Sequence, residues 1–228
     1  MRILFVALLG LSLLGCASED SRPFNIKNLA KSDVDLVTEI HLEQLRTLTE
    51  QLIIKLYKRN PRELKKNSGM TIDARVAQLM TVNRPEKGFI ELGYMDGVDV
   101  LPLAFSKEFK GDRVFALMSG ITGMLSASYE NKLEFYLIDD IDEQKLYNSA
   151  RNLEKIAWQL NNSKYDDGTL LLLTNGYDKN GVANFSYERI LGQLIIIQDT
   201  MATIIADSNN RTINKVVHSV ASLTFFPI

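Results

Sequence analysis

The chain has little of the chemistry on which many enzymes rely. Its 228 residues include one cysteine, Cys16, and two histidines, His41 and His218. A single cysteine cannot form an intramolecular disulfide or a cysteine cluster for a metal, so the fold must be stabilised by its hydrophobic core. His41 lies on an apolar helical stripe and His218 on the flank of another expected helix. We interpret both as core or surface histidines rather than as catalytic bases or metal ligands.

Several well-known catalytic and binding motifs are also missing. The sequence contains no Gly-x-Ser-x-Gly, no His-Glu-x-x-His, no Walker loop and no dinucleotide-binding glycine pattern. These absences weaken the hydrolase, metalloprotease and nucleotide-binding interpretations, and we expect no catalytic residue, no metal and no cofactor. An excess of charge of one sign is missing as well, since 26 Lys and Arg face 28 Asp and Glu. The resulting net charge of −2 argues against a nucleic-acid partner.

The N-terminus carries the most informative feature that is present. Arg2 precedes an apolar run, residues 3–14, which is too short to cross a bilayer as a helix. A positive start, an apolar core and a small residue before the cleavage point are typical of a secretory signal peptide. The run ends in Leu13-Leu14-Gly15-Cys16, which resembles the lipobox of bacterial lipoproteins. The resemblance implies that residues 1–15 are a signal peptide and that Cys16 carries a thioether-linked diacylglycerol.

The same resemblance implies a location. Lipoproteins of this class carry three acyl chains, and two or more chains anchor a protein firmly in a bilayer. An Asp directly after the cysteine usually retains such proteins in the inner membrane, whereas this chain has Ala17. We therefore expect a lipid-anchored protein on the periplasmic face of the outer membrane. An ordinary signal peptide or a buried core helix is the alternative interpretation of residues 3–14.

Residues 16–31 read as a lipidated tether, because they are polar at first and are interrupted by Pro23. Such a tether reaches about 50 Å when fully extended. The remaining residues, 32–228, predict a single all-α periplasmic domain with one or two short strands at most. Apolar residues recur there at steps of three and four, as in helices with one buried face. The expected helices are residues 32–60, 61–66, 71–80, 113–129, 142–160, 186–207 and 208–223.

Two further segments have a less regular pattern. Residues 132–139 predict a short strand, and residues 170–173 predict either a buried strand or irregular chain that fills the core. Residues 83–111 contain four glycines and two prolines between short apolar pieces and are expected to be rich in loops. Such a region is the largest place where a binding surface could be built.

Glycines inside the expected helix at 113–129 indicate where that helix packs. Gly120, Gly123 and Ala127 fall on one of its sides, where small residues let another helix approach closely. Glycine inside a helix otherwise costs roughly 1 kcal/mol relative to alanine. We expect this helix and the strongly apolar one at 186–207 to form the centre of the domain, with the remaining long helices around them.

A basic segment at the end of the first expected helix is the strongest charge feature. Six cations fall within twelve positions, and only Glu63 opposes them. The cations are Lys55, Lys58, Arg59, Arg62, Lys65 and Lys66. A solvated helix end, favoured by the helix macrodipole, explains them without a partner. The functional alternative is an anionic partner, for which the envelope offers phospholipid headgroups, lipopolysaccharide phosphates and acidic envelope proteins.

An acidic cluster precedes the expected helix at 142–160. It consists of Asp139, Asp140, Asp142 and Glu143. These carboxylates could hold calcium, but the alternating ligand spacing of a calcium loop is absent. Capping of the following helix explains Asp140 or Asp142 without a ligand.

Two stretches of the mature chain, residues 56–64 and 133–154, resemble segments of uncharacterised proteobacterial lipoproteins. The resemblance implies the envelope location and a helical domain, and it implies no activity. We therefore expect a non-catalytic interaction or structural module. The alternative is a carrier of an apolar, lipid-like ligand, whose cavity of several hundred Å³ would be walled by the glycine side of the 113–129 helix and by residues 170–173. An enzyme is the third interpretation.

Overall fold

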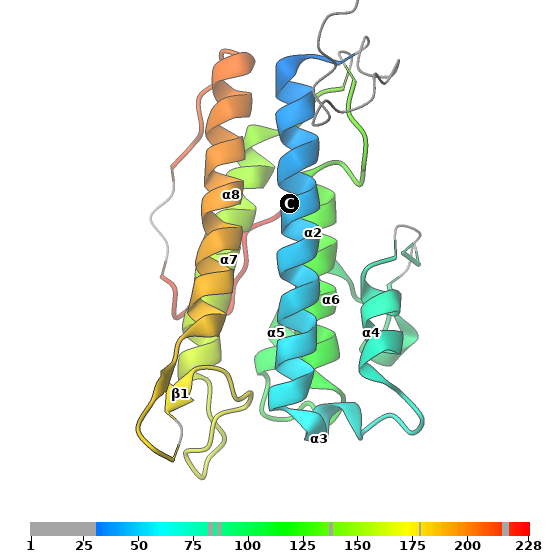
Figure 1. The fold of residues 1–228 in the computed structure, drawn as a ribbon, viewed down its shortest axis with the longest axis vertical. Helices are drawn as coiled ribbons and strands as arrows, with labels where there is room; N and C mark the ends of the chain where they lie inside the picture. The colour runs from blue at the N-terminus through cyan, green and yellow to red at the C-terminus, as the bar shows by residue number, and fades with distance from the viewer. Residues whose placement is uncertain (1–30, 82–83, 86–87, 137–138, 178, 216–218) are drawn as a thin grey trace, which may run out of the picture. The chain divides into compact units, whose positions relative to one another are not determined.

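Helices make up most of the structure (Figure 1). The computed structural model describes residues 31–228 except 82–83, 86–87, 137–138, 178 and 216–218. The expected signal peptide, Cys16 and His218 therefore lie outside the described residues. Residues Lys31–Ile228 form one unit around a shared hydrophobic core. The all-α prediction is confirmed, because the described residues contain two very short strands besides the helices.

The first described helix, α2 (Asp33–Arg59), begins and ends where the sequence predicts. Ser32 and Asp35 form a capping box in which each side chain accepts a hydrogen bond from the other residue's backbone N–H. Pro61 has no backbone N–H, so it interrupts the helical hydrogen bonds and becomes the first residue of α3 (Pro61–Leu64). The chain therefore turns sharply at the end of α2.

Short helices follow. Thr71, the first residue of the predicted helix 71–80, caps α4 (Ile72–Leu79) by accepting a hydrogen bond from the backbone N–H of Ala74. The stretch expected to be rich in loops contains two 3₁₀ turns, η2 (Ile90–Leu92) and η3 (Gly97–Val100), and a short helix, α5 (Leu101–Phe105). The other described residues of this stretch are turns or irregular chain, so the loop-rich prediction is confirmed, with short helical turns between the glycines and prolines.

The central helix is α6 (Arg113–Ser128), which is buried on most of its surface. Its glycines face η3 and α5. A Cβ atom on Gly120 would overlap the side chain of Leu101, and one on Gly123 would lie 2.8 Å from the backbone nitrogen of Gly97. The central position and the close approach at the glycine side are thus confirmed. The partner is a pair of short helices rather than one long helix.

Helices α7 (Glu143–Asn162) and α8 (Ser186–Ser208) lie side by side and run in opposite directions (Figure 1). Asp142 caps α7 as predicted, with its carboxylate accepting two backbone hydrogen bonds. The sequence favours Ser186 as the N-cap of α8, whereas Phe185 occupies that position and Ser186 is the first residue of the helix.

The central position predicted for α8 is wrong. Leu194 and Gln198 are buried, whereas Gly192, Gln193 and Ile196 are exposed, and Ile196 keeps 60% of its surface accessible. Helix α8 packs against α7 and α2 and leaves its third flank uncovered. Its apolar composition predicts burial on every side, but nothing in the composition determines which neighbours surround it.

The sheet consists of β1 (Gly176–Tyr177) and β2 (Ala183–Asn184), paired antiparallel with Gly176 opposite Asn184. Residues 170–173 are predicted to be either a buried strand or irregular chain. They are irregular apart from one β-bridge between Leu170 and Lys164. Leu171 and Leu172 are buried in this irregular chain and fill the core.

The strand predicted at residues 132–139 is wrong for the residues that the structure describes there. The Lys132 ammonium and the backbone N–H of Tyr136 both bond to the Asp139 carboxylate and close a turn. Phe135 is fully buried, and its ring centroid lies 6.3 Å from that of Tyr129. The apolar residues of this segment anchor a loop, because no described strand lies beside it to pair with.

The helix predicted at residues 208–223 is also wrong in its described parts, which are extended or turn-like. Polar side chains on α7 bind this backbone instead. Asn152, which is fully buried, donates to the carbonyl of Phe226 at 2.9 Å and accepts from its N–H at 2.7 Å. Gln159 donates to the carbonyl of Ala221 at 3.1 Å. These bonds replace the ones that a helix would make within itself.

Candidate functional site

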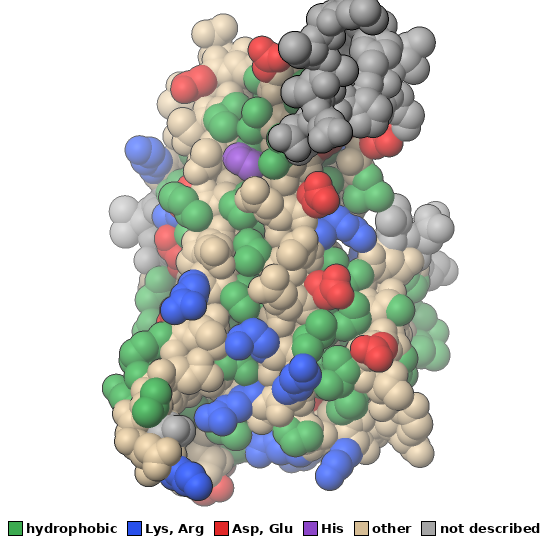
Figure 2. Space-filling view, viewed as in Figure 1, with side chains coloured by type: hydrophobic (Ala, Val, Ile, Leu, Met, Phe, Trp, Pro, Cys, Tyr) green, Lys and Arg blue, Asp and Glu red, His purple; other side chains and the backbone are tan. Residues whose placement is uncertain are grey.

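The basic segment lies at one end of the bundle, where α2 passes into α3. Figure 2 shows Lys and Arg side chains gathered over the lower end of this face. The side chain of Asn60 organises the turn, because it donates to the carbonyls of Leu56 and Leu173 at 2.9 Å each and accepts from the N–H of Leu173 at 2.7 Å. The end of α2 is thereby joined to residues more than a hundred positions later in the chain.

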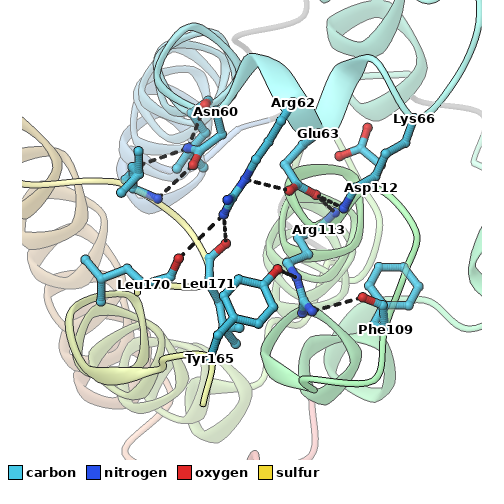
Figure 3. Close-up of polar contacts among 12 residues, drawn as sticks. Asn60, Arg62, Glu63, Lys66, Phe109, Asp112, Arg113, Tyr165, Leu170 and Leu171 are labelled. Carbon is cyan, nitrogen blue, oxygen red and sulfur yellow. Dashed lines mark hydrogen bonds and ion pairs between the residues drawn. The ribbon is translucent and has the colours of Figure 1, made fainter. Parts of the chain in front are cut away.

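Three of the six cations are held by contacts within the fold. The Arg62 guanidinium donates to the carbonyl of Leu171 at 2.9 Å and lies 5.9 Å from the ring centroid of Tyr165. Lys66 donates to the carbonyl of Gly111 at 2.8 Å. The Lys55 ammonium lies 5.1 Å from the ring centroid of Tyr187. Figure 3 shows Arg62 directed at the carbonyls beside it.

The other three cations face solvent. Lys58, Arg59 and Lys65 are exposed and make no salt bridge or hydrogen bond with any residue that the structure describes. The structure therefore divides the predicted set into a structural half and a free half. Sequence spacing could not make this division, because the partners of Arg62 and Lys66 lie far along the chain.

Glu63 is a buried anion beneath the basic segment. It is fully buried, and its carboxylate accepts from the backbone N–H of Arg113 at 2.8 Å and from Lys66 at 2.7 Å, with the Arg62 guanidinium at 3.3 Å. Figure 3 shows this carboxylate between α3 and the first turn of α6. A carboxylate there is stabilised by the helix macrodipole. Sequence reasoning noted Glu63 as the one acid among the cations but not its role in joining α3 to α6.

A second buried network surrounds Asp112. The carboxylate of Asp112 caps α6 through the N–H of Phe115 at 2.9 Å and accepts from the Tyr57 hydroxyl at 2.9 Å. The Arg75 guanidinium is completely buried, lies 3.5 Å from Asp112 and donates two hydrogen bonds to Glu91, at 2.7 and 3.0 Å. Asp112 directly precedes this helix in the sequence, as a cap does, but the sequence contains no signal for the ion pairs.

Burial and charge act in opposite directions on the two carboxylates of this network. Burial raises the pKa of the Asp112 carboxyl above its ordinary value, and the hydrogen bonds that it accepts oppose that rise. The hydrogen bond from Arg75 lowers the pKa of Glu91, which is part-exposed. Burial also raises the pKa of the Tyr57 hydroxyl, so this group stays protonated.

A pocket of about 240 Å³ opens between α3 and η2, beside this network. Both signs of charge line it. Its lining residues are Lys66, Asn67, Glu91, Leu92, Lys110, Gly111, Asp112 and Phe115. Its two carboxylates are both engaged with Arg75, so neither is placed as a free acid or base for catalysis.

The cavity expected for a carrier is not found at the predicted place. The glycine side of α6 is in close contact with η3 and α5, and Leu171 and Leu172 are buried in the core. A partly open pocket between α2, α4 and α6 measures about 60 Å³. A groove of about 630 Å³ between α2 and α8 is open to solvent and mixes Ile40, Leu48 and Ile196 with polar side chains.

The acidic cluster before α7 has structural partners. Asp142 caps α7, Asp140 pairs with Arg211 at 3.1 Å, and Asp139 pairs with Lys132. His41 is part-buried on α2, and burial lowers its pKa. No three His, Cys, Asp or Glu side chains among the described residues are grouped as a metal site would require.

Comparisons of the chain with protein-family models, with curated proteins and with solved structures found no match. Among the described helices, α8 is long and apolar enough to cross a membrane by length and composition. Half of its most apolar window is buried inside the fold, as is usual for the core helix of a bundle.

Proposed function

We propose that the protein is a lipid-anchored envelope domain on the periplasmic face of the outer membrane and that it binds an anionic partner through the basic end of its bundle. The lipobox at Cys16 and the Ala17 that follows it support the anchor and the location. The observation that carries the binding function is the free half of the basic segment. Lys58, Arg59 and Lys65 are exposed and flank a turn that Asn60, Arg62 and Lys66 fix in place.

The geometry supports binding rather than catalysis. The carboxylates nearest to the basic end, Glu63 and Asp112, are buried in ion pairs and hydrogen bonds that join helices. A fixed cationic surface attracts phosphates or carboxylates without needing a reactive group. An apolar-ligand carrier has less support, because the pocket between α2, α4 and α6 measures only about 60 Å³ and the groove of about 630 Å³ between α2 and α8 is open to solvent.

The position of the basic end determines which partners it can reach. The tether joins the domain at the start of α2, and the exposed cations lie at the other end of this 27-residue helix, about 40 Å away at 1.5 Å per residue. A tether of about 50 Å is long enough to turn the domain back onto its own membrane. The same length also lets the basic end face a partner further into the periplasm.

Metabolic labelling with an alkyne fatty acid tests the anchor. The parent chain should incorporate label and fractionate with outer membranes, and Cys16→Ser should incorporate none. Ala17→Asp is the matched control, because it should remain labelled but move to the inner-membrane fraction. Equal labelling of the parent and Cys16→Ser would overturn the proposed function.

A further inference from the structure

The hairpin beside the basic end exposes large apolar side chains. Tyr177 is 69% exposed, Val182 63% and Phe185 55%, and Leu173 just before the hairpin is 43% exposed. The rings of Tyr177 and Phe185 meet edge to face, with centroids 6.2 Å apart. These four residues are named the apolar tip from here on. Figure 2 shows hydrophobic side chains at the lower left of the view, the end of the bundle at which Figure 1 labels β1.

The apolar tip and the basic segment are attached to each other. The Asn60 side chain bonds both the N–H and the carbonyl of Leu173. The Arg59 guanidinium lies within 3.7 Å of where a side chain on Gly176, in β1, would begin. The Tyr187 hydroxyl, at the start of α8, donates to the carbonyl of Lys55 at 2.9 Å. The two surfaces are therefore presented together at one end of the bundle.

Exposed cations lie on the chain segments next to the apolar tip. Lys179 lies in the hairpin between β1 and β2, Arg189 in the first turn of α8 and Lys164 at the bridge to Leu170, and all three are exposed, as is Lys58 at the end of α2. Among the acids described at this end, Glu63 is buried and Asp166 pairs with Lys107, whereas Asp167 and Glu188 are exposed and accept hydrogen bonds from neutral groups. Among the described residues, the charge available to a partner at this end is therefore mainly positive.

We propose that the apolar tip enters the headgroup region of an anionic phospholipid bilayer while the surrounding cations bind the lipid phosphates. Exposed aromatic and β-branched side chains within a border of Lys and Arg suit this environment, where rings lie at the interface and cations meet negative headgroups. An acidic protein would satisfy the cations but leave the apolar tip in water. The proposal rests on the proposed function, since it names the bilayer as the anionic partner.

The test places a probe on the tip of the lipidated full chain. Cys16 is the single native cysteine and its sulfur is used by the lipid, so Val182→Cys provides a unique thiol for an environment-sensitive fluorophore. Thr203→Cys, exposed far along α8, is the matched control position. Each protein is reconstituted in vesicles of phosphatidylcholine with or without phosphatidylglycerol, and quenching by a nitroxide lipid is measured.

The expected result is quenching at position 182 in anionic vesicles at low salt. Quenching should be weak at position 182 in pure phosphatidylcholine and weak at position 203 in either kind of vesicle.

The double variant Tyr177→Ser and Phe185→Ser should weaken docking of the tip by at least about tenfold, since two partly buried rings are lost from the interface. Ile90→Ser, which removes an apolar side chain that is 73% exposed outside the apolar tip, should have no effect. Helical circular dichroism verifies that each variant folds.

Other outcomes overturn the proposal. Absence of quenching at position 182 in every vesicle, or equal quenching at positions 182 and 203, contradicts docking through the apolar tip. Capture of an acidic protein by the basic end with no response of the tip probe assigns the surface to a protein partner. Retention of the protein on the vesicles at high salt measures the lipid anchor alone. Loss of this retention therefore indicates failure of the anchor, whereas absence of quenching at position 182 indicates failure of the apolar tip.

Discussion

At the scale of single residues, Asp112 shows how one buried carboxylate joins distant parts of the chain. It caps α6, accepts the Tyr57 hydroxyl from α2 and lies beside Arg75 of α4. Arg75 in turn stacks on Phe115, with its guanidinium carbon 3.9 Å from the ring centroid, and binds Glu91. Removal of one of these side chains leaves the others buried without all of their hydrogen-bond partners. The resulting loss of stability exceeds the net contribution of any single bond.

The pH dependence of stability tests this network. Because Arg75 lowers the pKa of Glu91 below its ordinary 4.5, ionised Glu91 stabilises the fold above about that pH, and the contribution is lost as the pH falls through the folded-state pKa. Glu91→Gln should therefore lower the free energy of unfolding at pH 7, and its deficit should shrink as the pH falls. Urea unfolding of parent and variant across a pH series measures the difference.

Asp112 provides an internal control, because its ionisation is expected to change stability with pH in the opposite direction. Its pKa is raised in the folded state, so its ionisation costs stability, and this cost is relieved as the pH falls. The parent should therefore gain stability relative to Asp112→Asn toward low pH. A deficit of Glu91→Gln that is constant from pH 7 to acid would contradict the assigned role of the Arg75–Glu91 pair.

At the scale of elements, the contact between α6 and η3 depends on glycine. A Cβ on Gly123 would meet the backbone of Gly97, which cannot move aside as a side chain can. Gly123→Ala should destabilise the protein by about 1–3 kcal/mol through overpacking. Gly120→Ala should cost less, because it meets the side chain of Leu101. Chemical denaturation measures both.

Gly192 is the matched control for these variants. It also lies in a helix, but a Cβ there meets nothing within 4 Å. Gly192→Ala should therefore stabilise the protein by about 0.5–1 kcal/mol through helix propensity. If Gly123→Ala behaved like Gly192→Ala, the close contact of α6 with η3 would not exist.

Elements with local signals could be predicted from the sequence, and elements with distant partners could not. Ser32, Thr71, Asp112 and Asp142 lie directly before their helices, so the capping bonds involve residues only a few positions apart. The extended C-terminal segment depends instead on Asn152 of α7, which lies 74 positions from its partner Phe226. The apolar spacing at 208–223 favours a helix, but it does not indicate that side chains of α7 bind this backbone instead.

The same distinction applies to the candidate site. The six cations of the basic segment are visible in the sequence because they are neighbours on one helix and the turn that follows it. Tertiary contacts across more than a hundred positions join Arg62 to Leu171. They also bring the hairpin, with Tyr177 and Phe185, beside the basic end. The sequence therefore located the charge but not the apolar tip beside it.

At the scale of the whole molecule, the central claim is that the exposed half of the basic segment binds an anionic partner. The most direct test is binding to anionic vesicles by the mature chain with Cys16→Ser, which has no lipid anchor. The test variant neutralises Lys58, Arg59 and Lys65 and leaves Arg62 and Lys66, which hold the fold. Exposed charges contribute little to stability, so the variant should stay folded.

Co-sedimentation across a salt series provides the measurement. The parent should bind anionic vesicles at low salt and dissociate as the salt rises, because salt screens charges over a Debye length of about 8 Å at physiological ionic strength. The triple variant should bind at least about tenfold more weakly, since each cation near an anionic surface contributes about 1 kcal/mol. Neutralising Lys215, an exposed cation outside the basic segment, should change binding little. Equal binding of the parent and the triple variant at low salt would contradict the account and identify the basic segment as a solvated helix end.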